Sequence, residues 1–182
     1  SEVFYEFEDV PHDLRFGAFC HPNCDCGRFM EIGNSVFMEY RKREDGTFER
    51  LAQRNVDFGG GLERITATSN NDPDVFNVDI FARMRAALHD ADGGASGEDA
   101  RRKTRVILDH VRASMFLIAD GVRPANKGQG YVLRRLLRRA MAHVRLLGLS
   151  GESLPVLTES VIVSYQDAYP ELEREKETIV KV

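Results

Sequence analysis

Hydrophobic and polar residues interchange at short intervals through the first sixty residues, as they do in strands that are covered on one face. Aromatic and branched apolar side chains fill residues 28–40, and Gly33 inside this segment indicates a bulge or a close approach of two backbones. The Asp45-Gly46 pair favours a hairpin turn. Strands are therefore expected over residues 3–8, 28–40, 47–51 and 55–58.

The pattern changes beyond residue 76, where apolar side chains recur at steps of three and four, the period of a helix packed on one face. Helices are expected over residues 62–67, 76–92, 105–119, 131–147, 155–169 and from 170 to the end. Residues 93–97, rich in glycine, are the clearest linker. The predicted fold class is α+β, an antiparallel sheet followed by an α-helical bundle, divided into residues 1–95 and 96–182.

The composition is that of a core-forming protein without a membrane anchor. Hydrophobic residues make up 42% and charged residues 30% of the 182 residues, which excludes a disordered chain. No run approaches the about 18 uncharged apolar residues that a membrane span needs. The acidic start has neither an initiator methionine nor a signal peptide. Because the start has no initiator methionine, we expect an internal piece of a longer chain. The number of cysteines, three, is odd and argues against a secreted domain built on disulfides, so we expect a cytoplasmic protein.

Positive charge is concentrated in one part of this acidic chain. The formal net charge is −4, yet residues 101–150 carry twelve basic and only two acidic side chains. Arg134 and Arg138, like Arg135 and Arg139, are spaced four apart, opposite the apolar stripe of the expected helix. A polyanion such as an RNA backbone would relieve the repulsion among them. A solvated helix face is the alternative.

All three cysteines, Cys20, Cys24 and Cys26, lie within seven residues of one another, with His12 and His21 nearby. Three thiolates and one imidazole, from His12 or His21, would complete a tetrahedral structural zinc site. The surrounding segment has few apolar side chains, so a metal could order it. Free thiols in a surface loop are the alternative, because the C-x₃-C-x-C spacing differs from the usual C-x₂-C pair.

A strand, three glycines and a helix follow one another in the string Asp57-Phe58-Gly59-Gly60-Gly61-Leu62-Glu63-Arg64. The glycines let a phosphate or an adenine ring approach the backbone with no Cβ in the way. Arg64, one turn into the helix, could hold a phosphate as a fixed fork, and Asp57 could fix an ammonium group or cap the helix. A plain turn is the alternative for the glycines, and the missing Lys-Ser/Thr ending excludes a P-loop.

The whole string is more specific than its glycines, because it resembles motif 3 of the class II aminoacyl-tRNA synthetases. Within that class the chain resembles the alanyl-tRNA synthetases over about residues 1–150, in three blocks with the family's order and spacing. The blocks are Glu31-Ile32-x-Asn34-x-Val36-Phe37-Met38 with Val56-Asp57-x-Gly59-x-Gly61-Leu62-Glu63-Arg64-Ile65, then Leu117-Ile118-Ala119-Asp120-Gly121-Val122-x-Pro124-x-Asn126, then Gly130-Tyr131-Val132-Leu133-Arg134-Arg135-x-x-Arg138-Arg139-Ala140.

The resemblance implies a ligase that activates alanine with ATP and moves the alanyl group to the 3′ end of its tRNA. Asp57 matches the carboxylate that holds the α-ammonium group of alanine. Asn34 and Val36 match residues that line the alanine pocket, and Gly59 matches its floor. A strand-end carboxylate beside glycines suits this role, because an opposite charge in a small site fixes the orientation of the substrate.

The resemblance also implies the ATP site. Arg64 matches the arginine that binds the triphosphate, with Gly59, Gly61 and Glu63 beside it, and Mg²⁺ would accompany the ATP. Arg64 and Asp57 are the expected catalytic residues. The reaction, an attack of a carboxylate on the α-phosphate, needs positioning and charge neutralisation more than a general base.

For the tRNA, the resemblance implies contact with the acceptor stem. Asn126 matches the asparagine that recognises the third base pair from the minor groove, where A-form RNA exposes its base edges. The four arginines from Arg134 to Arg139 would bind the neighbouring phosphates.

The chain departs from the family at Gly33, where the family usually has tryptophan. Either another side chain fills the gap, or the amino-acid selectivity differs. Motifs 1 and 2 of the family lie N-terminal to the matched region. We therefore expect residues 1–95 to be the C-terminal half of the aminoacylation domain with a Cys-rich insert, and residues 96–182 to be part of the helical tRNA-binding domain. Alone they would be inactive.

Two further expectations concern assembly and an alternative function. The exposed sheet edge would pair in a homodimer or with the rest of the parent protein, because an unpaired strand edge offers free backbone donors and acceptors. The alternative function is that of a non-catalytic tRNA-binding paralogue that keeps the scaffold.

Overall fold

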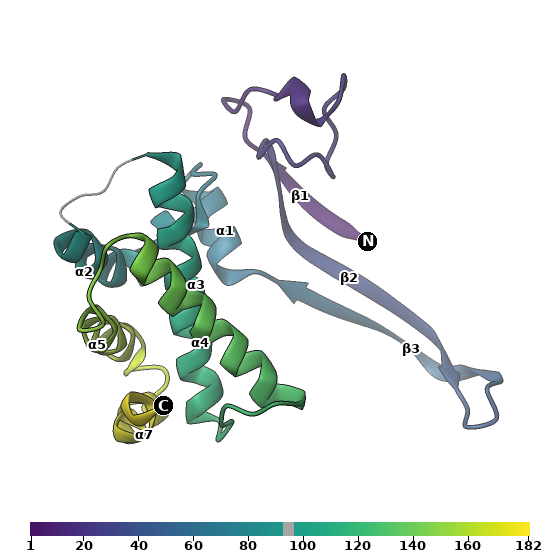
Figure 1. The fold of residues 1–182 in the computed structure, drawn as a ribbon. Coiled ribbons are helices and arrows are strands. Elements are labelled where there is room, and N and C mark those ends of the chain that lie inside the picture. The colour runs from purple at the N-terminus through teal and green to yellow at the C-terminus, as the bar shows by residue number, and fades with distance from the viewer. Residues whose placement is uncertain (93–96) are drawn as a thin grey trace. The chain divides into compact units, whose positions relative to one another are not determined.

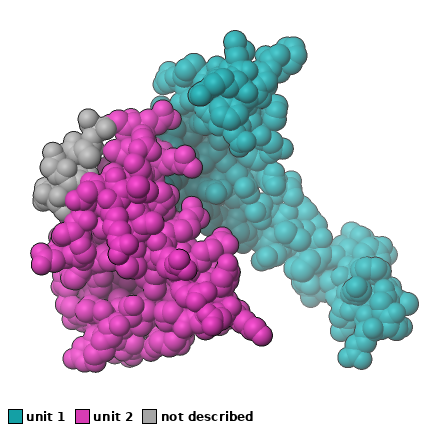
Figure 2. All heavy atoms as spheres, in the orientation of Figure 1, with its two compact units in different colours: residues 1–78 teal, residues 79–182 magenta. Residues whose placement is uncertain are grey.

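The computed structural model describes residues 1–92 and 97–182, which form two compact units, Ser1–Val78 and Asp79–Val182 (Figure 2). The first unit holds an antiparallel sheet and one α-helix, and the second is built of helices (Figure 1). The predicted α+β class is therefore confirmed. Among the described residues, no helix has both the length and the apolar character that crossing a membrane requires.

The sheet of the first unit has three antiparallel strands in the order β1-β2-β3. They are β1 (Glu2–Glu6), β2 (Phe29–Lys42) and β3 (Phe48–Gly60). The long strands β2 and β3 form a hairpin (Figure 1). In its turn the Arg43 N–H donates to the Thr47 carbonyl at 2.9 Å, and the Asp45 carboxylate accepts from the Thr47 N–H at 2.9 Å. The Asp-Gly turn predicted from the sequence is confirmed.

The strand β3 is one continuous element, where two short strands were expected. Its extra residues are accommodated as an irregularity in the pairing, in which Glu39 of β2 stands opposite residues 51–54 of β3. The Glu39 carboxylate lies 2.6 Å from the Arg50 guanidinium and 2.9 Å from that of Arg54. These two ion pairs hold both ends of the bulged segment against β2, so a local break in the hydrophobic pattern does not break the strand.

The helix α1 (Leu62–Ser69) follows β3 directly, and a backbone hydrogen bond ties its start to β2. The Gly61 N–H donates to the Ile32 carbonyl at 3.0 Å. Ile32 is the extra residue of a β-bulge, because Val3 of β1 pairs with Gly33 and the next β1 residue pairs with Glu31. The bulge bends the strand where it meets the start of α1. A 3₁₀ turn, η2 (Val75–Asn77), completes this unit.

The second unit packs its helices around one apolar core. Its elements are η3 (Asp79–Phe81), α2 (Ala82–Asp92), α3 (Glu98–Ala119), α4 (Gly128–Leu146), α5 (Ser153–Tyr165), α6 (Glu171–Arg174) and α7 (Lys176–Lys181). Helix α3 packs against α4, and α2 packs against α5. Met84, Ile107, Leu133 and Val161 are fully buried at these contacts. Helices lie in all the regions where they were predicted, although α3 begins seven residues before the expected position. The α-helix expected from residue 76 begins only at Ala82, after two 3₁₀ turns, and the one expected from residue 170 is divided into α6 and α7.

The two units divide after Val78, before the predicted linker. Residues 93–96 of that linker lie outside the described residues. Helix α2 belongs to the helical unit because it packs against α5. The domain limits predicted from the sequence, residues 1–95 and 96–182, stay a prediction.

Candidate functional site

The four residues expected around alanine come together on one face of the β2–β3 hairpin. Asn34 stands opposite Gly59, and Val36 stands opposite Asp57. Opposite residues of an antiparallel pair share a face, as do residues two apart on one strand. Both pairs therefore lie on the same face, next to each other. All four residues are exposed to solvent, so this face is open to a ligand.

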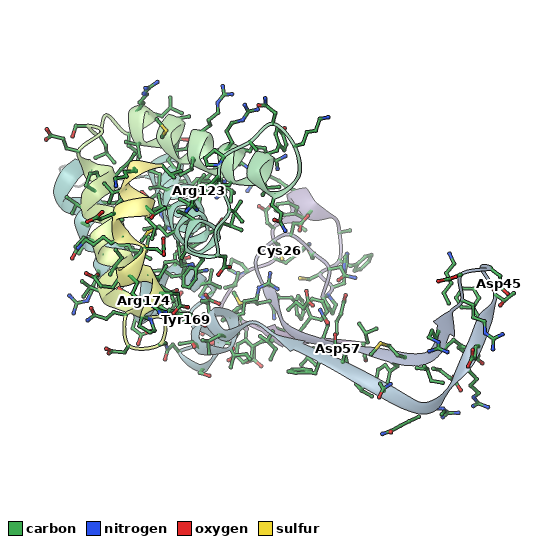
Figure 3. The ribbon with its side chains drawn as sticks, turned by 90° about the horizontal axis from the view of Figure 1, so that it is seen from below. Cys26, Asp45, Asp57, Arg123, Tyr169 and Arg174 are labelled. Carbon is green, nitrogen blue, oxygen red and sulfur yellow. The ribbon has the colours of Figure 1, made fainter. Side chains whose placement is uncertain are left out.

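The Asp57 carboxylate is available on this face (Figure 3). Within the described part of the chain it makes no hydrogen bond or ion pair. The N-cap of α1 is Gly61, with no side-chain hydrogen bond, so Asp57 does not cap that helix. An unpaired carboxylate beside Gly59 can hold a cationic group of a ligand without first breaking an internal contact.

Glu31 joins the two halves of the site, and the sequence assigned it no role. Its Oε1 accepts a hydrogen bond from Asn34 Nδ2 at 3.0 Å, and its Oε2 lies 3.6 Å from Arg64 Nη1. The same Nη1 donates to the Glu31 backbone carbonyl at 3.0 Å. The Arg64 guanidinium is thus held through Nη1, while half of the side chain (52%) stays exposed to solvent. The only sequence signal was the place of Glu31 at the head of the first family block.

Gly33 lies on the opposite face of the sheet from Asn34, because neighbouring residues of a strand point to opposite faces. A Cβ at Gly33 would lie 2.9 Å from the Gly59 carbonyl oxygen and 3.0 Å from Cζ of Phe58. The Phe58 ring therefore covers the space beside Gly33. Of the two expectations for the missing tryptophan, this geometry supports the one in which another side chain fills the gap.

The arginines of α4 form a second candidate surface. Tyr131, Arg134, Arg135, Arg138, Arg139 and Ala142 line a hollow of about 320 Å³. Arg134 donates from Nη1 to Asn126 Oδ1 at 2.6 Å, and its guanidinium lies 5.9 Å from the centre of the Tyr131 ring. Arg135, Arg138 and Arg139 are exposed and have no ion-pair partner among the described residues. The surface therefore presents three uncompensated positive charges.

Gly130 fixes the Asn126 loop against this surface. A Cβ at Gly130 would lie 2.6 Å from the Ala125 side chain and would collide with the Arg123 carbonyl oxygen. The Ala125 N–H also donates to the Gly130 carbonyl at 3.0 Å. Only glycine permits this close approach, which keeps Asn126 beside Arg134.

A family model described as tRNA synthetases class II (A) matches residues 1–182. The chain belongs to this family. Curated relatives named alanine–tRNA ligase include one from Caldicellulosiruptor saccharolyticus, 42% identical over 165 residues, which are 90% of this chain and 19% of the relative. The alanine–tRNA ligase 1 of Lachnoclostridium phytofermentans is 40% identical over 187 residues, 100% of this chain and 21% of the relative. The alanine–tRNA ligase of Nitrobacter winogradskyi is 41% identical over 180 residues, which are 98% of this chain and 20% of the relative.

These matches confirm the resemblance to the alanyl-tRNA synthetases. The chain spans about a fifth of the length of the curated relatives it matches. The family match includes the residues around Asp57 and those of α4, so both candidate surfaces lie within one class II synthetase chain.

The cysteines of this class II synthetase chain cluster with His12 and not with His21. The ligand atoms of His12, Cys20, Cys24 and Cys26 all lie within 4.8 Å of one another. His21 is exposed and lies outside the cluster. All three cysteines are free thiols. The hydrogen bond with the His12 side chain, followed by that with the Arg28 backbone, lowers the pKa of the Cys26 thiol to about 6.

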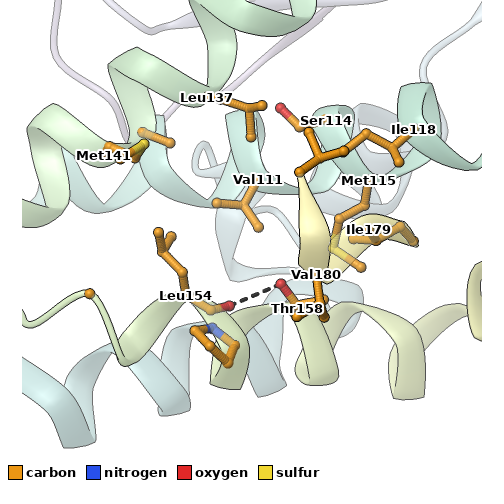
Figure 4. Close-up of a pocket in the computed structure, with 14 residues that line it drawn as sticks. Val111, Ser114, Met115, Ile118, Leu137, Met141, Leu154, Thr158, Ile179 and Val180 are labelled. Carbon is orange, nitrogen blue, oxygen red and sulfur yellow. Dashed lines mark hydrogen bonds between the residues drawn. The ribbon is translucent and has the colours of Figure 1, made fainter. Parts of the chain in front are cut away.

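The helical unit also contains an apolar cavity of about 330 Å³, which α3, α4, α5 and α7 line (Figure 4). Val111, Leu137, Leu154 and Ile179 are among its lining residues, none of which has a charged side chain. Thr158 donates from its hydroxyl to the Leu154 carbonyl within α5 at 2.9 Å. A cavity with this lining offers nothing to bind a triphosphate or the charged groups of an amino acid, so it is no candidate for the synthetase substrates.

Proposed function

We propose that the protein containing this chain is an alanine–tRNA ligase, which activates alanine with ATP and transfers it to tRNA(Ala). The observation that supports this most strongly is the shared open face of Asn34, Val36, Asp57 and Gly59. Asp57 would hold the α-ammonium group of alanine, and Val36 would contact its methyl group. Gly59, having no side chain, leaves room for the amino acid against the strand.

In this proposal Arg64 binds the triphosphate of ATP, with Gly59, Gly61 and Glu63 beside it. Its hydrogen bond to the Glu31 carbonyl holds one end of the guanidinium, so less side-chain freedom is lost when phosphate binds. The alanine carboxylate attacks the α-phosphorus, and pyrophosphate leaves. A tRNA 3′-terminal hydroxyl then attacks the alanyl carbonyl, and AMP leaves. Mg²⁺ accompanies the ATP and neutralises phosphate charge.

The same proposal assigns the tRNA acceptor stem to α4. The exposed Arg135, Arg138 and Arg139 would contact phosphates, which gives affinity without reading the sequence. Asn126 would reach a base edge in the minor groove of the stem. This assignment is supported by the hydrogen bond that Arg134 donates to Asn126 Oδ1, because it keeps the amide beside the arginines of α4.

Location and assembly complete the proposal. We place the enzyme in the cytoplasm, where protein synthesis uses it. The outer edge of β3 would pair with another strand, from a second copy or from the rest of the synthetase. This is supported by exposed apolar side chains on β3, including Val56 at 60% and Phe58 at 63%. Sedimentation analysis of the chain at several concentrations tests whether it dimerises.

The test of the function is amino-acid-dependent exchange of pyrophosphate into ATP, measured on the full-length gene product. Alanine should support exchange, and glycine and serine should support far less at equal concentration. Aminoacylation of tRNA(Ala) should follow in the same preparation. Acceptor-stem binding without exchange by a folded protein would overturn the proposal and favour a non-catalytic tRNA-binding paralogue.

A further inference from the structure

Residues 11–27, which form most of the connection between β1 and β2, contain almost no apolar core. Of residues 11–27 only Cys24 is buried, at 7% exposure. Its large apolar side chains, Leu14, Phe16 and Phe19, are 75%, 46% and 84% exposed. The segment has one regular element, the single 3₁₀ turn η1 (Leu14–Phe16). Hydrophobic burial therefore cannot offset the entropy lost when these residues are ordered, and another interaction must do so.

The side chains that do turn inward include four of the kinds that bind metals, three cysteines and one histidine. Cys20 Sγ lies 3.6 Å from Cys26 Sγ, and Cys24 Sγ lies 3.7 Å from His12 Nδ1. In tetrahedral Zn²⁺ sites with Zn–S of about 2.3 Å and Zn–N of about 2.0 Å, neighbouring ligand atoms are separated by about 3.5–3.8 Å. The two distances match this spacing, and all four ligand atoms lie within 4.8 Å of one another, so a modest inward movement would place them around one ion.

The His12 ring is already oriented for binding through Nδ1. Its Nε2 lies 2.9 Å from the Gly17 carbonyl oxygen. A carbonyl can only accept a hydrogen bond, so Nε2 carries a proton, and Nδ1 faces the cysteines as the ring nitrogen that would bind a metal. A hydrogen bond of this kind on the distal ring nitrogen is the usual support of a zinc-bound histidine.

We propose that His12, Cys20, Cys24 and Cys26 bind one Zn²⁺ ion that holds the β1–β2 connection together. Four protein ligands close the tetrahedron, which makes the site structural, with no open position for a substrate or a water. Three thiolates and a neutral imidazole give the centre one net negative charge. The Arg28 guanidinium, which pairs with Glu6, also interacts electrostatically with Cys20 and Cys26 and so favours this charge.

The centre would fix the start of β2. Arg28 donates from Nε to Glu6 Oε1 at 2.7 Å and from Nη1 to the Val10 carbonyl at 3.3 Å. The Phe7 N–H donates to the Arg28 carbonyl at 2.8 Å. Both ends of the connection therefore meet at Arg28, two residues after Cys26. Metal binding would hold the two strand ends that these bonds join.

The test begins with the zinc content and free thiols of the chain, purified under reducing conditions without chelators. One zinc per chain is expected, with the three thiols unreactive until the metal is removed. His12→Gln and Cys24→Ser should weaken zinc binding by more than about tenfold. His21→Gln is the matched control, because it changes a histidine of the same loop outside the cluster, and it should bind zinc as the wild type does.

A second measurement keeps the proposal falsifiable where a variant folds poorly. Co²⁺ added to the metal-free wild-type chain should give the intense visible absorption of a tetrahedral thiolate site. Zinc removal should speed amide hydrogen exchange in residues 11–27 and leave the helical unit unchanged. An octahedral cobalt spectrum, equal zinc binding by the His12→Gln and His21→Gln variants, or unchanged exchange after zinc removal would each overturn the proposal.

Discussion

Single residues on the two faces of the β2–β3 hairpin have different roles. Asn34 and Asp57 lie on the candidate alanine face. Gly33 lies on the opposite face, where the Phe58 ring covers the space beside it. The sequence located Asp57 and Asn34 because a family motif contains both. It could not show that Glu31 joins Asn34 to Arg64, because that contact depends on the bulge at Ile32, which is a property of the pairing with β1.

Replacement of Glu31 by alanine should impair activation without unfolding the protein. Asn34 and Arg64 would lose the carboxylate that both contact, and misplacement by about 1 Å can cost about 10²-fold in rate. The matched control is Glu49→Ala, which removes a similarly exposed carboxylate paired with Arg43 at 2.6 Å. Exchange rates of the two full-length variants within twofold of each other would contradict the role of Glu31.

Two glycine substitutions should separate stability from activity. A methyl group at Gly33 meets the Gly59 carbonyl and the Phe58 ring, so Gly33→Ala should lower the free energy of unfolding by about 1–3 kcal/mol. At Gly59 the nearest atom is Asn34 Oδ1 at 3.8 Å. Gly59→Ala should leave stability nearly unchanged and raise KM for alanine, because the methyl group enters the substrate face. Urea unfolding measures stability, and exchange kinetics measure KM for alanine. A larger loss of stability in Gly59→Ala than in Gly33→Ala, with the larger rise in KM in Gly33→Ala, would contradict the pairing of β2 with β3 described above.

At the scale of elements, the sequence predicted helices and strands well where one face is apolar. It missed the start of α3 because residues 98–104 carry no apolar stripe. That turn is stabilised instead by Glu98 and Asp99 near the positive end of the helix dipole. It divided β3 because residues 52–54 carry no large apolar side chain, whereas the ion pairs of Glu39 keep them in the strand. Both errors come from charged contacts, which leave no periodic pattern in the sequence.

The packing of α4 against α3 predicts a pH-dependent stability. Burial, with the nearby positive charges of Arg139, His110, Lys103 and Arg102, lowers the pKa of His143 below 6.5. The unfolded chain therefore binds a proton at His143 before the folded chain does, and stability falls as pH drops below about 6.5. The slope from this group is at most about 1.4 kcal/mol per pH unit. In urea unfolding between pH 7 and pH 5, His143→Gln should flatten the dependence, and an unchanged slope would refute the assignment.

At the scale of the whole molecule, the candidate surfaces for substrate chemistry and for RNA contact lie in different units. The candidate alanine face belongs to the first unit, and the arginines of α4 belong to the second. The sequence indicated this separation through its charge, because most basic residues follow residue 100. The packing units divide after Val78, because the contact of α2 with α5 joins residues far apart in sequence, and the domain boundary at residue 95 stays a prediction.

The salt dependence of RNA binding tests the role assigned to the second unit. Arg135→Gln with Arg139→Gln should weaken binding of a tRNA(Ala) acceptor-stem duplex and lower the slope of log K against log salt by about 1.5–2. The control is Arg101→Gln with Arg102→Gln, which removes the same charge from exposed positions on α3. Equal losses in the two double variants would mean that net charge, rather than the α4 surface, governs binding.

The central claim is that the carboxylate of Asp57 holds the ammonium group of alanine. The most direct measurement is the alanine dependence of ATP–pyrophosphate exchange by the full-length protein, its Asp57→Asn variant and the control Asp45→Asn, which alters a carboxylate at the hairpin turn (Figure 3). The claim predicts that Asp57→Asn lowers kcat/KM for alanine by about 10²-fold or more with KM for ATP unchanged, while Asp45→Asn behaves as the wild type. Exchange by Asp57→Asn with the kinetics of Asp45→Asn would contradict it.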